Sequence, residues 1–114
     1  MKEDRMSSKS VEIIKKAMEE RKSISAYYDR FFRKLSPYEL ATKKGKYQCL
    51  FYQYGGESSS GIINGRSKSN WRCLELGKLT QIQILEEPLH KPEIISHKKP
   101  SYCVDNIIKQ IYIE

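Results

Sequence analysis

The chain has 114 residues, of which 39% are hydrophobic and 31% are charged. This length gives room for one domain with a modest core, and the composition is too apolar for a wholly disordered chain. Lys and Arg number 21 against 14 Asp and Glu, which gives a net charge of +7. A basic surface favours anionic partners, nucleic acid first and a phosphate-bearing small ligand second, although solvated lysines alone would give the same charge.

The N-terminus and the cysteines narrow the class of protein. The first residues lack the apolar segment of a signal peptide, and no stretch approaches the ~20 apolar residues of a membrane span. Cys49, Cys73 and Cys103 lack the paired spacing of a zinc site. The first two sit in apolar runs, which predicts small core residues rather than ligands. We therefore expect no membrane, no metal and a reducing, cytoplasmic location.

An amphipathic helix is predicted over residues 11–22, after a disordered tail over residues 1–9. Val11, Ile14 and Met18 recur at helical spacing, and charged residues cover the opposite face. Ser10 is placed to cap the helix. The apolar stripe is narrow, so the helix should dock on the structure that follows it.

Short strands rich in β-forming residues follow the helix, and they are predicted at 24–28, 31–35, 38–42, 47–54, 71–76 and 79–85. Turns are expected at Asp29-Arg30 and at 43–46, so the strands flanking the second turn should pair as a hairpin. Pro37 marks an edge or a bend. Residues 55–70 have the composition of mobile loops. The strand at 79–85 carries apolar residues on both faces, which indicates a central or covered position.

The last part of the chain, residues 87–114, is predicted to be a proline-containing linker and a C-terminal extension. Val104, Ile107 and Ile108 favour a short helix there, with a terminal strand as the alternative. The main domain then covers residues 10–86. Its one helix and five or so short strands predict a mostly β fold with an N-terminal helix and a small, strongly curved antiparallel barrel, because a flat sheet of this size could not cover its own core.

Three stretches of this domain are similar to a known family. Residues 33–40, Arg-Lys-Leu-Ser-Pro-Tyr-Glu-Leu, fit the pattern of Arg, one residue, an aliphatic, one residue, Pro, two residues, Leu. Residues 45–52, Gly-Lys-Tyr-Gln-Cys-Leu-Phe-Tyr, stand where that family has the tripeptide that names it. Residues 72–79, Arg-Cys-Leu-Glu-Leu-Gly-Lys-Leu, resemble its Arg-containing strand. On these residues the chain resembles a WYL domain over about residues 11–86.

The resemblance implies an Sm-like five-stranded barrel with a ligand-sensing or nucleic-acid-binding role. Such domains usually serve transcription regulators, beside a winged-helix DNA-binding domain, and sometimes CRISPR-associated accessory proteins. The chain departs from the family in having Tyr47-Gln48-Cys49 for Trp-Tyr-Leu, and Lys78 for an Arg, which loses bidentate geometry. One helix precedes the strands, which is too little for a helix-turn-helix, so we expect a stand-alone version or an excised domain.

The residues of a predicted anion site follow from this resemblance. Arg33, Arg72 and Lys78 match the family's basic positions, and Arg66 lies on the nearby loop. A guanidinium group offers a planar fork to phosphate. The alternative for the two strand arginines is an ordinary solvated strand face.

Aromatic residues beside these cations could stack on unpaired bases. Of the strand tyrosines, Tyr52 is preferred to Tyr47, since residues five apart on a strand point to opposite faces. Trp71 borders a polar loop and is a second candidate, with a rim residue that closes the barrel as the alternative.

Catalysis is not expected, and neither is a cofactor. His90 and His97 have no cysteine or carboxylate at ligand or triad spacing. Adjacent carboxylates at Glu86-Glu87 point apart on an extended chain. Gly55-Gly56 is not followed by the Lys of a phosphate-binding loop.

The sequence therefore leads to two hypotheses. The first is a regulatory module that binds single-stranded RNA or DNA, or a nucleotide-like anion, on a basic barrel face, in transcription regulation or CRISPR-type defence. The second is a protein-protein interaction module that modulates a larger nucleic-acid-processing complex, with the barrel edge or the C-terminal segment as the docking surface. An open edge and an apolar tail also invite a homodimer without specifying one.

Overall fold

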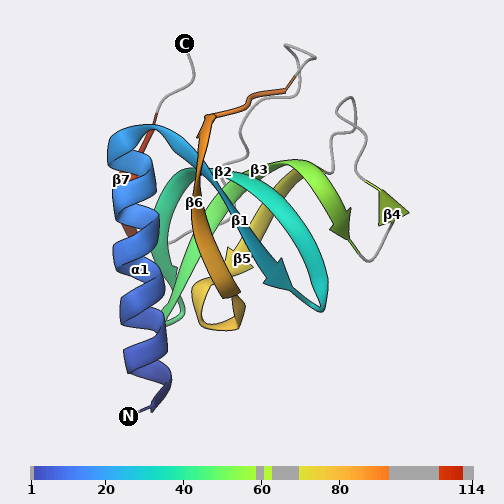
Figure 1. Ribbon diagram of the computed structural model, residues 1–114. Helices are drawn as coiled ribbons and strands as arrows, with labels where there is room; N and C mark the ends of the chain where they lie inside the picture. The colour runs from blue at the N-terminus through green and yellow to red at the C-terminus, as the bar shows by residue number, and fades with distance from the viewer. Residues whose placement is uncertain (1, 59–60, 63–69, 93–105, 112–114) are drawn as a thin grey trace.

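The structure is a computed structural model that describes residues 2–58, 61–62, 70–92 and 106–111. A helix, α1 (Lys2–Glu20), lies against one antiparallel sheet (Figure 1). The strands are β1 (Lys22–Tyr28), β2 (Phe31–Lys43), β3 (Lys46–Ser58), β4 (Gly61–Ile62), β5 (Trp71–Glu75), β6 (Thr80–Pro88) and β7 (Asn106–Gln110), with a 3₁₀ turn, η2 (Leu76–Lys78), between β5 and β6.

The sheet has the order β4-β3-β2-β1-β6, with β5 paired to β3 and β7 paired to β2. A mostly β fold with one N-terminal helix and an antiparallel sheet is therefore confirmed. The described strands do not close into a barrel, because among them β6 pairs only with β1 and β5 only with β3.

Both hairpins turn where the sequence predicts. Asp29 and Arg30 have φ of 52° and 68°, and Lys44 and Gly45 have φ of 52° and 79°. Two consecutive residues with positive φ match the right-handed twist of the flanking strands, and Asp and Gly tolerate this region. The β1–β2 and β2–β3 hairpins follow from these turns.

The helix is longer than predicted. It begins at Lys2, so residues 2–9, expected to be a disordered tail, are helical, and Ser10 lies inside the helix instead of capping it. Lys, Glu, Arg and Met are good helix formers, and no Gly or Pro interrupts this stretch. The helix ends at Glu20, and Arg21 takes a φ of 53°, the left-handed conformation that commonly follows a helix.

Two strand predictions need correction. The strands expected at 31–35 and 38–42 are one strand, β2, because Pro37 only shifts the register against β3. The strand β3 continues to Ser58, through Gly55 and Gly56, where the composition predicts a loop. The strand β6, predicted to be central or covered, lies at the end of the sheet, and α1 covers part of it, which agrees with the second alternative.

The helix expected near the C-terminus is also wrong. Residues 106–110 form β7, which pairs with Glu39–Thr42 of β2. The strand β1 covers only Phe31–Leu35 of β2, so the edge beyond it is open to β7. Within residues 87–114, residues 106–110 thus belong to the same sheet as β1, β2 and β3.

The core lies between α1 and the curved sheet. Ile14 and Met18 of the helix are almost wholly buried, as are residues of the first three strands, among them Ile24, Leu35, Leu40, Leu50 and Phe51. The predicted stripe of α1 therefore docks as expected. No helix among the described residues is long and apolar enough to span a bilayer.

Alkaline pH should destabilise the fold through a buried tyrosine. The Tyr38 hydroxyl donates a hydrogen bond of 2.7 Å to the backbone oxygen of His90, and burial raises the pKa of Tyr38 to about 12. In the unfolded chain the pKa is about 10, so this tyrosine loses its proton there first. We expect the free energy of unfolding to fall as the pH rises from about 10 to about 12.

The check is a series of urea titrations over that pH range. Tyr38→Phe should make the fall shallower without removing it, since burial also raises the pKa of Tyr54 to about 12. Tyr47→Phe is the matched control, because Tyr47 is exposed. An equal effect of both substitutions would contradict the prediction.

Candidate anion-binding site

Arg33 lies in β2 and its side chain is buried, with 3% of the residue exposed. Its Nε donates to the Tyr28 backbone oxygen at 3.3 Å, and its Nη1 donates to Gln53 Oε1 at 3.2 Å. The guanidinium carbon lies 5.3 Å from the ring centroid of Tyr28 and 5.9 Å from that of Phe31. These contacts fix the direction of the cation, and the solvated strand face considered for Arg33 is not what the structure shows.

Gln53 and Gly56 of β3 lie next to Arg33. Gln53 is fully buried, and its amide nitrogen donates to the backbone oxygens of Gly55 and Glu57 at 3.1 and 3.0 Å. Gly56 pairs with Arg33 at a φ of 81°, and a Cβ there would lie 2.2 Å from the Phe32 carbonyl oxygen. Only glycine allows this close approach of the two strands.

Arg72 of β5 is the second cation of the site. Burial lowers the pKa of its guanidinium, and the positive charge of Arg33 lowers it further. Burial also lowers the pKa of Arg33, while Asp29 opposes this change. Both groups stay charged at neutral pH because the pKa of arginine lies so high. Arg33 lies in β2 and Arg72 in β5, and β3 pairs with both strands, so the two arginines come from strands on either side of β3.

A bound anion would reduce the electrostatic repulsion between the two guanidinium groups. Among the described residues no carboxylate forms an ion pair with Arg33, and only two of its five N–H groups donate the hydrogen bonds given above. Two like charges that are partly removed from water repel each other more strongly than in solvent. A phosphate group beside Arg33 would accept charge-assisted hydrogen bonds from its remaining N–H groups.

The other predicted basic residues do not join this pair. On β5, Arg72 lies opposite Phe51, whereas Glu75 lies opposite Gln48. Lys78 follows in η2, about 10 Å or more farther along β3 by the rise of a strand, and it is exposed. Arg66 lies outside the described residues.

The two predicted stacking residues are buried. Tyr52 is 2% exposed and Trp71 is 8% exposed. Their ring centroids are 5.3 Å apart in an edge-to-face contact, and Trp71 makes a similar contact with Tyr38 at 5.4 Å. This packing agrees with the alternative for Trp71, a residue that closes the rim of the core, and offers neither ring as an open platform.

Other aromatic residues surround the site. Tyr27 and Tyr28 are among the strand tyrosines that the sequence offers for stacking, whereas Phe31 and Phe32 were not predicted. Tyr28 and Phe31 flank Arg33 on the inner face of the β1–β2 hairpin, and Tyr27 and Phe32 form an exposed edge-to-face pair on its outer face. The predicted turn at Asp29-Arg30 could have revealed these positions, because in a two-residue hairpin the residues that flank the turn lie directly opposite each other. No sequence pattern indicated that Gln53 would accept a hydrogen bond from Arg33.

A second polar cluster surrounds Glu87 at the end of β6. Its carboxylate accepts hydrogen bonds from Tyr54 Oη at 3.1 Å and Lys34 Nζ at 3.3 Å, and His90 Nε2 lies 3.9 Å away. Burial opposes ionisation of Glu87, but these partners outweigh it and lower the pKa. The His90 ring stacks on Tyr54 with centroids 3.7 Å apart. The cluster fastens the chain after β6 to the sheet.

The cysteines fall into two environments. Cys49 is a free thiol buried in the core, as predicted, and burial raises its pKa well above the ordinary value. Cys73 is disulfide-bonded, which the spacing of the cysteines did not reveal. Cys103 and His97 lie outside the described residues. Within the described part of the chain, no group of three or more His, Cys, Asp or Glu side chains could hold a metal ion.

Comparison with protein-family models gave no match, and neither did comparison with curated proteins or with solved structures.

Proposed function

We propose that this chain is a regulatory binding module that recognises phosphate-bearing ligands through Arg33 and Arg72. The observation that carries the proposal is a pair of guanidinium groups, that of Arg33 in a buried residue and that of Arg72 in a half-buried one. Burial lowers the pKa of Arg72, and the positive charge of Arg33 lowers it further. Tyr28 and Phe31, packed around Arg33, add aromatic rings to the same place. The ligand class is single-stranded RNA or DNA, or a nucleotide-like anion.

The test is fluorescence anisotropy of labelled single-stranded RNA and DNA at several salt concentrations. Phosphate contacts release counterions, so the affinity should fall linearly with salt on a logarithmic scale. Arg72→Gln removes one cation without placing a negative charge in the site, and it should weaken binding to both nucleic acids and make the salt dependence shallower by about one unit. Binding that ignores salt, or an unchanged Arg72→Gln variant, would reject the proposal.

The resemblance to a WYL domain, with its Sm-like barrel, forms part of this proposal. It is supported by the helix followed by antiparallel strands and by the burial of Arg33 in β2. A role in transcription regulation or in CRISPR-type defence follows only from that resemblance. A cytoplasmic location is also only a proposal. The disulfide at Cys73 counts against it, because disulfides are more common in oxidising compartments.

A protein-interaction module is the second candidate function, and exposed apolar side chains favour it. Phe32 is 41% exposed at the hairpin tip, and Ile107 and Ile108 of β7 are 48% and 44% exposed. Deleting residues 87–114 would remove part of the sheet, so point substitutions give the cleaner test. If Ile107→Ser with Ile108→Ser abolishes capture of a nucleic-acid-processing partner while Arg72→Gln does not, the interaction role is the right one.

A further inference from the structure

The burial of Arg33 limits which phosphate groups can reach it. The residue is 3% exposed, and its guanidinium group is held by the Tyr28 backbone oxygen and by Gln53. An arginine on an open surface can extend toward the phosphates of a bound strand, whereas this side chain would first have to break both hydrogen bonds. The rings of Tyr28 and Phe31 beside it are half-buried, so the group lies just below the surface. A ligand must therefore bring its phosphate to Arg33.

Internal and terminal phosphates differ in how well they can enter such a place. An internal phosphodiester has a sugar on both sides and carries one negative charge. A terminal phosphomonoester is attached on one side only, so it can enter end-on. It presents three free oxygens and a charge of about −1.5 to −2 at pH 7. The buried position of Arg33 thus favours the terminal group.

Arg33 has donors left for this group. A guanidinium group has five N–H donors. Among the described residues, two of the five make the hydrogen bonds given above, which leaves one N–H on Nη1 and two on Nη2. These can donate to more than one oxygen of the same phosphate, and such charge-assisted hydrogen bonds are the strong ones. In the described part of the chain no carboxylate forms an ion pair with Arg33.

The charges near Arg33 also suit a dianion. The positive charge of Arg33 lowers the pKa of Arg72, so the two guanidinium groups act on each other. The carboxylate of Asp29 raises the pKa of Arg33, but burial outweighs it. Since Asp29 is exposed on the hairpin turn, solvent screens its charge more than it screens the buried guanidinium group. A dianion would balance both arginines, whereas a phosphodiester would balance one.

We propose that Arg33 binds a terminal phosphomonoester, at the end of a single strand or on a nucleotide, in preference to the phosphodiesters inside a strand. This inference rests on the proposed function, because it names the kind of phosphate that the same site takes. A strand end and a nucleotide share this chemistry, and competition by a mononucleotide separates them.

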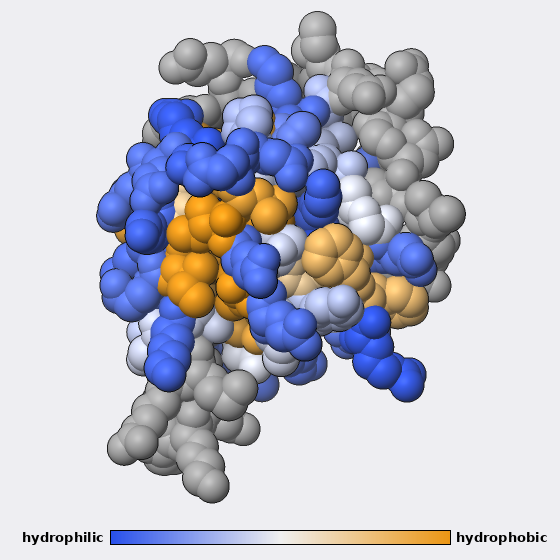
Figure 2. Space-filling model, viewed as in Figure 1, coloured by the Kyte–Doolittle hydropathy of each residue, from blue (hydrophilic) through white to orange (hydrophobic). Residues whose placement is uncertain are grey.

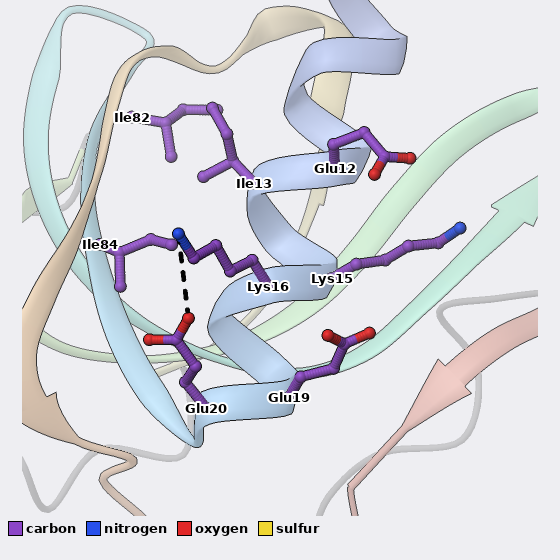
Figure 3. A pocket seen from close by; sticks show the side chains of 8 residues that line it. All are labelled: Glu12, Ile13, Lys15, Lys16, Glu19, Glu20, Ile82 and Ile84. Carbon is purple, nitrogen blue, oxygen red and sulfur yellow. Dashed lines mark ion pairs between the residues drawn. The ribbon is translucent and has the colours of Figure 1, made fainter.

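The groove between α1 and β6 does not suit a phosphate. Its apolar lining comes from Ile13 of α1 and from Ile82 and Ile84 of β6 (Figure 3). Figure 2 shows an apolar patch over this region, bordered by hydrophilic residues. The charged lining comes from α1 and holds more carboxylates than cations: Glu12, Glu19, Glu20, Lys15 and Lys16. The side chain of Lys16 is 68% exposed, so this lysine provides a control for the loss of one positive charge away from Arg33.

Fluorescence anisotropy of a short single-stranded RNA, labelled at an internal base, tests this preference on the full chain. The RNA is prepared with a 5′-phosphate, with a 3′-phosphate, or with hydroxyl groups at both ends. A phosphate at the 5′ or the 3′ end should tighten binding at least about tenfold, because it adds charge-assisted hydrogen bonds. This preference should shrink as the pH falls below about 6, where the terminal phosphate loses its second charge. The comparison changes only the RNA, so it does not depend on the folding of a variant.

Two variants and a competitor locate the group. Arg33→Met should make the three RNAs bind equally, whereas Lys16→Met should leave the preference intact. A nucleoside 5′-monophosphate that displaces the phosphorylated RNA, where the nucleoside does not, identifies a nucleotide ligand. Displacement by phosphorylated strands alone identifies a strand end.

The outcomes separate this inference from the proposed function. Equal, salt-dependent affinities of the wild type for all three RNAs would overturn the preference and leave the proposed function standing. A preference that persists in Arg33→Met would also overturn the inference, since another residue would then hold the phosphate. Absence of salt-dependent binding to every RNA would reject both.

Discussion

Gly56→Ala should lower the free energy of unfolding by about 3 kcal/mol, which is a large fraction of the stability of a domain of this size. The added Cβ would lie 2.2 Å from the carbonyl oxygen of Phe32 and 2.8 Å from the Cα of Arg33, and both are backbone atoms that cannot move alone. The φ of 81° adds the cost of a left-handed conformation for alanine. The strands β2 and β3 would have to separate at the place where Arg33 is held.

Gly45→Ala separates the cost of the steric overlap from the cost of the left-handed conformation. Gly45 has nearly the same φ, 79°, but a Cβ there would meet nothing within 4 Å. It should lose only about 1 kcal/mol. Urea denaturation of both variants measures the difference, with m-values compared to check that unfolding stays two-state. Equal losses would mean that β3 does not approach Arg33 as closely as the structure shows.

Arg33→Met should weaken binding of single-stranded RNA at least about tenfold and make its salt dependence shallower by about one unit. Methionine keeps an unbranched, flexible stem but removes the charge and every N–H donor. It also leaves the buried Oε1 of Gln53 without the donor at 3.2 Å, which should cost about 1–3 kcal/mol of stability. The two effects are separated by measuring affinity well below the unfolding transition.

Lys78→Met is the matched control for charge. It removes the same single positive charge from an exposed position in η2, after the end of β5. Binding should change little. Equal losses for Arg33→Met and Lys78→Met would indicate a diffuse basic surface in place of a defined site. Arg33→Lys provides a third point, since it keeps the charge and loses the planar fork.

Local chemistry made some elements predictable from the sequence. The pairing of β1 with β2 could be predicted because Asp29-Arg30 is a two-residue turn between alternating apolar runs. The buried face of α1 could be predicted because Val11, Ile14 and Met18 repeat with the period of a helix. In both cases the residues that decide the structure are close in the chain.

Other elements depend on tertiary context. Ile107 and Ile108 fit a helix and a strand equally well, and the open edge of β2 beyond β1 decides for a strand. The period-two pattern at 79–85 could not tell a central strand from an edge strand half covered by a helix. The position of Gly56 depends on how closely β2 passes, and no local pattern reports that distance.

The candidate site was predictable in part. The resemblance suggested cations at Arg33 and Arg72 on neighbouring strands, whereas in the structure β3 lies between their strands. Burial and the charge of Arg33 both lower the pKa of Arg72. The burial of Arg33 and its bond to Gln53 were not predictable, since an arginine on an alternating strand fits either face. The stacking role assigned to Tyr52 overlooked that a strand central to the sheet buries alternate tyrosines on its concave face.

The central claim is that Arg33 and Arg72 bind one anion together, and NMR of the arginine Nε–Hε groups tests it most directly. Inorganic phosphate and a short single-stranded RNA would be added in turn to the ¹⁵N-labelled full chain. If the two arginines share an anion, their resonances should shift together and saturate at the same ligand concentration, while that of Arg30 on the hairpin turn changes little. Shifts confined to Arg30 and other exposed side chains, with Arg33 and Arg72 unmoved, would contradict the claim.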